Sequence, residues 1–263
     1  MKENIQKIIT DDGSIGLYDK NLDEIFHSKF GAKTEAFEKF VEPCLFMKNS
    51  QIDILDICYG IGYNTKTALK YFENIKTIDC VEIDQELILE SFKFDFDIDV
   101  NKIIEENIKT PDFIRFFACD IREIIKKLNK KYDIIFHDGF APHKQSELWS
   151  EDLILEITKL MKSNSIYVTY NHSKPVLNAL FKAGLSVGKT IKNNKTIGTV
   201  ASFDEKLIKN PLDSFEIGQL NTKSAITYKD KHLNLSHGEI LQNREIEVQN
   251  SKLISLSKYL KEN

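Results

Sequence analysis

The chain is short of cysteine and has no long hydrophobic run. Its cysteines, at positions 44, 58, 80 and 119, show no C-x-x-C or other spacing typical of a metal site. Three of them lie inside apolar segments, where buried free thiols are common, and this usage is typical of a reducing cytosol. No apolar run approaches the length of a membrane span, and none follows the polar start Met-Lys-Glu-Asn. We therefore expect no metal site, no membrane association and a cytoplasmic location.

An excess of positive charge is also lacking, because 36 Lys and Arg face 40 Asp and Glu and the formal net charge is −4. No global basic field therefore indicates nucleic acid. The charge is uneven, however: residues 161–203 contain lysines and no acid. This segment is either a phosphate-contacting surface or a solvated rim without acids.

No internal repeat or low-complexity tract is present, and 263 residues fit one α/β domain with additions, or at most two small domains. We expect residues 1–50 to form an N-terminal extension, 51–203 the core, and 204–263 a partly helical C-terminal extension. In the first segment, glycines at 13 and 16 predict a turn or hairpin, and TEAFEKFVEPCLF predicts a short helix closed by Pro43. In the last, Ser236 and Glu239 have the spacing of a capping box and predict a helix.

Strand and helix patterns alternate from residue 52 onward. The predicted strands are 52–58, 76–82, 113–120, 132–138 and 165–170, and the predicted helices are 64–73, 85–92, 121–130, one capped by Ser150, and 174–183. A charged, poorly periodic insertion occupies about 94–112. Two further strands, 184–191 and 196–203, flank the plausible hairpin turn Asn193-Asn194, which predicts an antiparallel edge pair. This alternation predicts an α/β fold with a mostly parallel sheet covered by helices.

A glycine-containing turn interrupts the stretch IDILDICYGIGYN, residues 52–64. A strand followed by Gly60, Gly62 and a helix places a nucleotide-like ligand at the carboxyl end of a parallel strand, where glycine lets the ligand approach the backbone. The next apolar run ends in Glu82, whose carboxylate suits two ribose hydroxyls. The pattern indicates an adenosine-bearing cofactor, or else an ordinary strand–turn–helix with incidental glycines.

Three acids end successive predicted strands: Glu82, Asp120 and Asp138. Because the carboxyl ends of parallel strands meet at one crevice, we expect all three to face one site. The position of Glu82 suits hydrogen bonds to the ribose hydroxyls of the cofactor. The position of Asp138 suits a place near the reacting end of the bound cofactor. Asp120 suits the exocyclic amine of adenine, the N-cap of the following helix, or both.

The loop DGFAPHKQSELW follows the third of these strands and sets Asp138 on a stiff turn beside an aromatic side chain. This arrangement suits an amine-bearing planar substrate. Phe140 and Trp149 are candidates for stacking on a base, and Lys144 for holding a phosphate. Trp149 is equally well explained as a core anchor at a helix start. Similarly, His27 in the polar loop HSKFGAK is either functional or a hydrogen-bonded structural histidine.

These segments resemble the MnmC-like tRNA methyltransferases over nearly the whole chain. The resemblance is carried by DDGSIGLYD, IFHSKFGAKTEAFEKF, ILDICYGIGYN, DGFAPHKQSELW and TYKDKHLNLSHGEILQNRE. It implies a Rossmann-like class I methyltransferase sheet with an antiparallel final strand, S-adenosylmethionine as cofactor, and the tRNA anticodon region as partner. The implied reaction forms 5-methylaminomethyl-uridine from 5-aminomethyl-uridine, with or without 2-thiolation, at the wobble position.

The resemblance also implies roles for individual residues. Asp138 is implied as the acid beside the transferred methyl. The expected cofactor-binding residues are Asp56, Gly60, Gly62, Asn64, Glu82, Asp120 and Ile121, of which Gly60, Gly62, Asn64 and Glu82 match the family pattern. The implied substrate-binding residues are His27, Ser28, Glu35, Phe140, Pro142, Lys144 and Trp149. This chain departs from the family pattern at Cys58, where glycine is usual, and at Thr196, where arginine is usual.

Some members of the family carry a C-terminal flavin-dependent oxidase. This chain ends too early for one and shows no second glycine fingerprint, so we expect methyl transfer alone. Three other functions remain open: methyl transfer to a small-molecule amine such as a polyamine, a nicotinamide-dependent oxidoreductase, and a catalytically silent tRNA-binding module. The sequence does not indicate which tRNAs are used, whether the uridine is thiolated, which enzyme supplies the aminomethyl group, or the oligomeric state.

Overall fold

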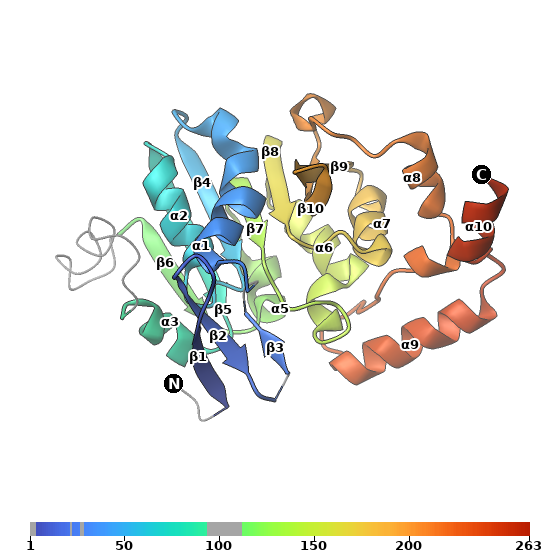
Figure 1. Ribbon diagram of the computed structural model, residues 1–263, viewed down its shortest axis with the longest axis horizontal. Coiled ribbons are helices and arrows are strands. Elements are labelled where there is room, and N and C mark those ends of the chain that lie inside the picture. Colours follow the sequence, from blue (N-terminus) through green and yellow to red (C-terminus); the bar gives the residue numbers. More distant parts are fainter. Residues whose placement is uncertain (1–3, 22, 27–28, 94–111) are drawn as a thin grey trace. The chain divides into compact units, whose positions relative to one another are not determined.

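The computed structural model describes residues 4–21, 23–26, 29–93 and 112–263 (Figure 1). The chain divides into two compact units, one made of Met1–Ile124 and Tyr132–Asp138, the other of Ile125–Lys131 and Gly139–Asn263. The N-terminal extension belongs to the first unit and the C-terminal extension to the second. The expected boundaries at residues 50 and 203 remain predictions, and all but the last residue of the expected insertion at 94–112 lies outside the described residues.

A parallel sheet forms the centre of the first unit. It consists of β4 (Ile52–Ile57), β5 (Ile75–Glu82), β6 (Ile114–Ala118) and β7 (Tyr132–His137), in the order β6-β5-β4-β7. Every residue of β4 and β7 is buried, as expected for strands in the middle of a parallel sheet. The carboxyl ends of the four strands therefore point the same way and supply one edge for a ligand site.

Helices follow the strands of this sheet as the alternation predicted. α2 (Tyr63–Tyr71) follows β4, and α3 (Gln85–Ser91), capped by the side chain of Asp84, follows β5. The helix predicted over 121–130 is much shorter, because only α5 (Ile121–Ile124) and the 3-10 turn η3 (Ile125–Lys127) form. The segment beyond it, LNKK, offers one apolar side chain for packing, too little to stabilise further helical turns.

The N-terminal extension begins with the predicted hairpin, β1 (Ile5–Ile9) and β2 (Ile15–Asp19), to which the short β3 (Glu24–Ile25) pairs. α1 (Ala32–Glu35) then continues without a break into the π-helical η1 (Ala36–Val41) and the 3-10 helix η2 (Glu42–Met47). The prediction that Pro43 closes this helix is wrong. Pro43 lies in the first turn of η2, where a backbone N–H is not needed.

The second unit contains the antiparallel part of the fold. Its elements are η4 (Ser146–Trp149), α6 (Glu151–Thr158), β8 (Met161–Thr169), α7 (Lys174–Lys182), β9 (Ser186–Lys192) and β10 (Lys195–Ser202). The last strand in the chain, β10, is antiparallel to both β8 and β9, in the order β8-β10-β9. Asn193 and Asn194 have φ values of 50° and 61° and form the predicted hairpin turn. The fold is therefore the predicted Rossmann-like α/β class, mostly parallel with an antiparallel final strand.

The C-terminal extension is more helical than the sequence indicated. It contains η5 (Glu205–Leu207), α8 (Ser214–Gln219), η6 (Lys223–Ala225), α9 (His237–Asn250) and α10 (Leu256–Glu262). The predicted capping box of Ser236 and Glu239 opens α9. Hydrogen bonds attach the extension to α6: the N–H of Glu151 donates to the carbonyl of Tyr228 at 2.8 Å, and the N–H of Asp230 donates to the side-chain Oδ2 of Asp152 at 2.7 Å. In the described part of the chain, no helix has the length and apolar character needed to cross a membrane.

Candidate active site

The turn after β4 is built on left-handed backbone conformations. Gly60 has φ 58° and Gly62 has φ 85°. A Cβ on Gly62 would lie 2.3 Å from the hydroxyl oxygen of Tyr59, so only glycine fits there. Cys58 also has a left-handed φ of 64°, a conformation that favours glycine. A residue with a Cβ adopts this conformation at a cost of about 1–2 kcal/mol.

Glu82 ends β5 and holds this turn. Its Oε2 accepts a hydrogen bond from the N–H of Gly60 at 2.9 Å, and its Oε1 accepts one from the N–H of Asp84 at 3.0 Å. The carboxylate is buried, and this burial raises its pKa. Each carboxylate oxygen has a second lone pair, so Glu82 can still accept hydrogen bonds from two vicinal hydroxyls.

Asp138 follows β7 directly and lies at the glycine turn. Its N–H donates to the carbonyl of Ile57 at 3.1 Å, and its Oδ2 accepts a hydrogen bond from Asn64 Nδ2 at 2.8 Å. Asn64 is the second residue of α2, immediately beyond Gly62 and Tyr63. The structure therefore brings the acid at the end of β7 to the glycine turn after β4, as the sequence predicted.

The surroundings of Asp138 favour its protonated form. Burial and, after it, the negative charge of Glu35 raise the pKa of Asp138 to about 8, although the bond from Asn64 opposes the rise. Burial also lowers the pKa of His137 to about 3, so this neighbouring imidazole is neutral and supplies no positive charge. A cation arriving beside Asp138 would favour loss of its proton.

Two buried acceptor atoms in this region have no hydrogen-bond partner among the described residues: Asp56 Oδ1 and Asn64 Oδ1. Asp56 is fully buried in β4, and its Oδ2 accepts the hydroxyl of Thr65 at 2.6 Å. Burial raises the pKa of Asp56 to about 7. Because a buried acceptor without a donor costs about 1–3 kcal/mol, these atoms indicate a ligand that carries donors such as an ammonium group.

The acids at the strand ends share one location. The pKa of the Cys58 thiol is raised first by burial and then by the charges of four acids, Glu82, Asp138, Asp56 and Asp120. All four therefore lie within electrostatic range of one side chain at the glycine turn. These acids therefore lie around the glycine turn, and the expectation that Glu82, Asp120 and Asp138 face one ligand site stays a prediction.

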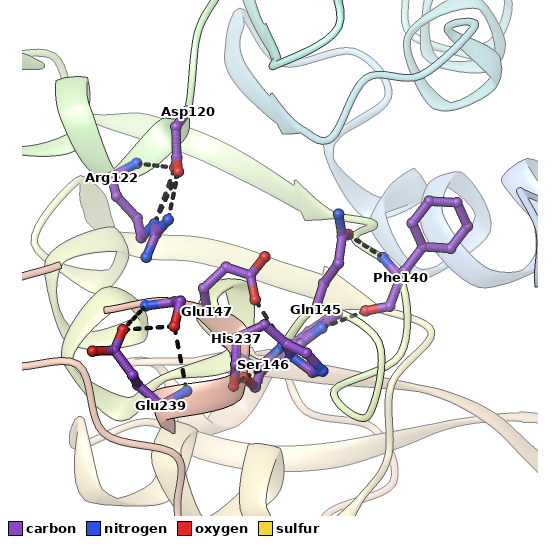
Figure 2. Close-up of polar contacts among 10 residues, drawn as sticks. Asp120, Arg122, Phe140, Gln145, Ser146, Glu147, His237 and Glu239 are labelled. Atoms are coloured by element: carbon purple, nitrogen blue, oxygen red, sulfur yellow. Dashed lines mark hydrogen bonds and ion pairs between the residues drawn. The ribbon is translucent and has the colours of Figure 1, made fainter. Parts of the chain in front are cut away.

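Asp120 has partners within its own segment (Figure 2). Its Oδ1 accepts the backbone N–H of Arg122 at 2.9 Å, and its Oδ2 lies 2.8 Å from Arg122 Nη2 in an ion pair. Asp120 thus serves the start of α5, which was one of the two roles expected of it. Ile121, the first residue of α5, is buried. Contacts of Asp120 and Ile121 with adenine remain predictions.

The loop after Asp138 belongs to the second unit and is held by its own side chains. The N–H of Phe140 donates to Gln145 Oε1 at 3.3 Å, and the carbonyl of Phe140 accepts Trp149 Nε1 at 2.6 Å. Trp149 is fully buried, which matches its interpretation as a core anchor. It therefore supports Phe140 and offers no exposed ring face of its own. Pro142 is buried, and Phe140 and Lys144 are half-buried.

Of the three remaining candidate substrate-binding residues, Glu35 lies in the described part of the chain. Glu35 is half-buried on α1 and forms an ion pair with Lys39, whereas His27 and Ser28 lie outside the described residues. The sequence analysis missed Thr65, Arg122 and Gln145. They lie two to nine residues from the groups they bind, yet a single side-chain hydrogen bond leaves no periodic pattern to predict it from. In the described part of the chain, no group of three or more His, Cys, Asp or Glu side chains is arranged to hold a metal ion.

Comparisons with known proteins agree with this geometry. The profile of an S-adenosyl-L-methionine-dependent methyltransferase family matches residues 96–203. The crystal structure of MnmC2 from Aquifex aeolicus superposes with a TM-score of 0.80 at 26% identity, covering 95% of this chain and 87% of that one. An uncharacterized protein of Methanocaldococcus jannaschii is 30% identical over 284 residues, covering 99% of this chain and 78% of the relative. The chain belongs to the MnmC-like family of S-adenosyl-L-methionine-dependent methyltransferases.

Other relatives set the limits of this assignment. The tRNA 5-methylaminomethyl-2-thiouridine biosynthesis bifunctional protein MnmC of Campylobacter hominis is 27% identical over 194 residues, covering 66% of this chain. This chain spans 29% of that protein's length. Spermidine synthase from Thermotoga maritima superposes with a TM-score of 0.60 at 14% identity, covering 91% of this chain and 83% of that one, a likeness of fold alone.

Membership of the MnmC-like family gives S-adenosylmethionine as the cofactor and decides against nicotinamide. The residues at the turn fit this molecule, because its ammonium group and ribose hydroxyls are donors and the acceptors of Asp56, Asn64 and Glu82 have capacity for them. When bound, the cofactor supplies an electrophilic methyl group on a sulfonium. The protein is thus an S-adenosylmethionine-dependent methyltransferase of the MnmC-like family.

Proposed function

We propose that the chain methylates the amine of 5-aminomethyl-uridine, or of its 2-thio form, at the wobble position of tRNA, giving 5-methylaminomethyl-uridine. The observation that carries the proposal is the hydrogen bond from Asn64 to Asp138, which sets a carboxyl of raised pKa beside the cofactor turn. The proposed acceptor is that of the bifunctional MnmC relatives, whose name describes tRNA 5-methylaminomethyl-2-thiouridine biosynthesis.

Each residue of the turn has a proposed role toward the cofactor. Asp56 and the free acceptor of Asn64 receive the ammonium group, because both have unpartnered buried oxygens. Glu82 receives the ribose hydroxyls. Gly60 and Gly62 let the ligand approach the backbone. Asp120 and Ile121 contact the adenine.

The proposed role of Asp138 follows from the chemistry of amines. A protonated amine has no lone pair, so the site must take its proton before methyl transfer. A carboxylate whose pKa is raised to about 8 accepts a proton from an ammonium far more readily than an ordinary aspartate does. S-adenosylmethionine held by Asp56, Asn64 and Glu82 would supply the methyl group to the amine lone pair that this proton transfer exposes. The new ammonium cation is stabilised by the negative charge of Glu35, and Asp138 releases to solvent the proton that it took from the amine.

The substrate contacts are proposed on the N-terminal extension and on the loop after Asp138. Glu35 adds negative charge for the amine, Phe140 and Pro142 shape the pocket for the base, and Lys144 binds phosphate. His27, Ser28 and Trp149 complete the proposed set, with Trp149 acting through Phe140. The lysines of residues 161–203 are proposed to contact the tRNA backbone.

The test is incubation of the protein with methyl-labelled S-adenosylmethionine and tRNA from cells that lack this methylation, followed by nucleoside analysis. The proposal requires label in a 5-methylaminomethyl-uridine nucleoside. Label transferred only to a free polyamine would establish the small-molecule alternative. Cofactor binding with no label in either acceptor would leave a tRNA-binding or other methyltransferase function and overturn the proposal.

A further inference from the structure

The first residue of α9, His237, contacts η4, which lies 91 residues earlier in the chain (Figure 2). The backbone N–H of Ser146 donates to His237 Nδ1 at 3.0 Å. The hydroxyl of Ser146 lies 2.9 Å from the same nitrogen and 3.2 Å from the carbonyl oxygen of His237. Ser146 is fully buried, whereas the imidazole is one-third exposed. This contact therefore fastens the C-terminal extension to the loop that follows Asp138.

The contact fixes the form of the imidazole. A backbone N–H can only donate, so Nδ1 must act as an acceptor and the proton of the ring resides on Nε2. The neutral ring is thus the form that holds Ser146. Protonation would place a hydrogen on Nδ1 and convert this acceptor into a donor, which is incompatible with the bond from the backbone N–H of Ser146.

A second partner for the same nitrogen lies within reach. Glu147 Oε2 is 3.6 Å from His237 Nδ1, beyond hydrogen-bond distance. This oxygen is buried and has no hydrogen-bond partner among the described residues. On the helix of His237 itself, the carboxylate of Glu239 is already engaged by the N–H and hydroxyl of Ser236, at 2.8 and 2.6 Å. Glu147 is therefore the acid that a protonated His237 would attract.

Serine, histidine and glutamate together suggest a nucleophilic triad, but the geometry excludes one. In a triad the two ring nitrogens face different partners, the nucleophile and the orienting acid. Here Ser146 and Glu147 both face Nδ1. His237 Nδ1 can therefore exchange Ser146 for Glu147 as its partner, but the three residues are not arranged to remove a proton from the Ser146 hydroxyl.

The turn that His237 holds supports Phe140 from both ends. Gln145, which precedes η4, accepts the N–H of Phe140, and Trp149, which ends η4, donates to the carbonyl of Phe140. Phe140 thus has both backbone groups bound to the flanks of η4. A displacement of η4 is transmitted directly to Phe140.

We propose that His237 is a positioning residue that sets Phe140 through η4, and that its protonation exchanges Ser146 for Glu147 as the partner of Nδ1. The link between Phe140 and the methyl acceptor rests on the proposed function, whereas the exchange itself does not. The consequence is a loop that holds the acceptor well when His237 is neutral and less well when His237 is charged.

Trp149 is the one tryptophan of the chain, so its fluorescence reports on η4 without any assay of activity. A titration from pH 8 to pH 5 spans the range in which histidines change charge. We expect the wild type to show a one-proton change in Trp149 emission. His237→Asn, whose amide oxygen can accept from Ser146 but cannot titrate, should abolish the change, and Glu147→Gln should reduce its amplitude. His232→Asn, at an exposed histidine of the same extension, is the matched control and should leave it intact. A change that persists in His237→Asn would overturn the exchange.

A second measurement tests the positioning role at pH 8. His237→Leu removes the acceptor, so the KM for tRNA should rise roughly three- to tenfold with a smaller change in kcat, and His237→Asn should restore the wild-type KM. Equal KM values in all three proteins would overturn the positioning role. If the fluorescence change depends on His237 as expected but no variant methylates tRNA, the proposed function has failed and the exchange stands.

Discussion

At the scale of single residues, two carboxyls hold their protons near neutral pH. Burial raises the pKa of Asp56 to about 7 and that of Asp138 to about 8, against about 4 in an unfolded chain. A carboxyl with a raised pKa contributes stability that is fully present below the unfolded pKa and is lost as the pH rises through the folded pKa. Above pH 8 both carboxyls are ionised, so the free energy of unfolding of the cofactor-free protein is lower there. A cation bound beside them offsets this loss.

Asp56→Asn should stabilise the cofactor-free protein at pH 8. The amide keeps an acceptor for Thr65 but removes the buried charge, so the free energy of unfolding should rise by on the order of 2 kcal/mol. At pH 4, where Asp56 is already protonated in the folded protein, the gain should vanish. Urea unfolding at the two pH values measures this. A gain of the same size at both would contradict the assignment to charge.

Cofactor affinity should increase between pH 6 and pH 8. Binding of a cation beside Asp56 favours the carboxylate, so complex formation releases a proton while the free protein holds one. Calorimetry in buffers of different ionisation enthalpy measures this release directly. Asp56→Asn should bind S-adenosylmethionine more weakly and without the pH dependence. Proton uptake on binding by the wild type would refute the proposed role of Asp56.

At the scale of elements, the N-terminal hairpin is fastened to α2. The hydroxyl of Tyr63, the first residue of α2, accepts the N–H of Ile15 at 3.1 Å and donates to the carbonyl of Ile15 at 2.8 Å. Their neighbours Leu17, Ala32 and Ile61 belong to the same buried cluster as Tyr63. The hairpin therefore supports the end of α2 that faces the glycine turn.

Tyr63→Phe should lower the free energy of unfolding by about 1–3 kcal/mol, because it removes both bonds and leaves two backbone groups unsatisfied. The affinity for S-adenosylmethionine should fall with it, since α2 carries Asn64 and Thr65. Tyr71→Phe, at the other end of the same helix, is the matched control, and its ring stacks on Phe37. Equal losses for the two variants would show that the hairpin contact contributes nothing specific.

Most elements of this fold could be predicted because their patterns are local. The strand before Gly60, the helix capped by Ser150 and the capping box at Ser236 each follow from a few adjacent residues. The errors arose where packing outweighs such signals. The helix through Pro43 continues because proline fits a first turn, and the helix after Asp120 stops because little apolar surface is available to bury.

At the scale of the whole molecule, charged side chains are unevenly distributed along the sequence, and residues 161–203 contain lysines but no Asp or Glu. The structure shows that some of these lysines are already engaged within the protein. Lys189 binds both oxygens of Glu216, at 2.8 and 2.7 Å. Lys195, in contrast, is exposed at the start of β10 beside the hairpin turn.

Lys195→Gln should weaken tRNA binding roughly two- to fivefold and reduce the salt dependence of binding by about one unit in the slope of log K against log salt. Lys189→Gln, which removes the same charge from a side chain held by Glu216, should change the slope less. Filter binding at several salt concentrations measures both. Identical slopes for wild type and Lys195→Gln would exclude this hairpin from the interface.

The candidate site was predictable in outline because strand ends in a parallel sheet converge. This rule is enough to bring Glu82, Asp120 and Asp138 to one place from the order of strands and helices alone. Contacts between residues far apart in the sequence could not be predicted. The contact of His237 with Ser146 joins residues 91 apart, and neither residue type nor periodicity indicates it. The raised pKa of Asp138 likewise depends on burial and on Glu35, which only the folded chain supplies.

The central claim is that Asp138 acts on the reacting amine rather than on the cofactor. The most direct test compares wild type with Asp138→Asn, measuring kcat for methyl transfer to tRNA and the Kd for S-adenosylmethionine on the same preparations. We expect kcat to fall by roughly 10²- to 10⁴-fold, the usual range for loss of a general acid–base group, while Kd changes less than about threefold. An unchanged kcat, or a loss of cofactor affinity as large as the loss of turnover, would contradict the claim.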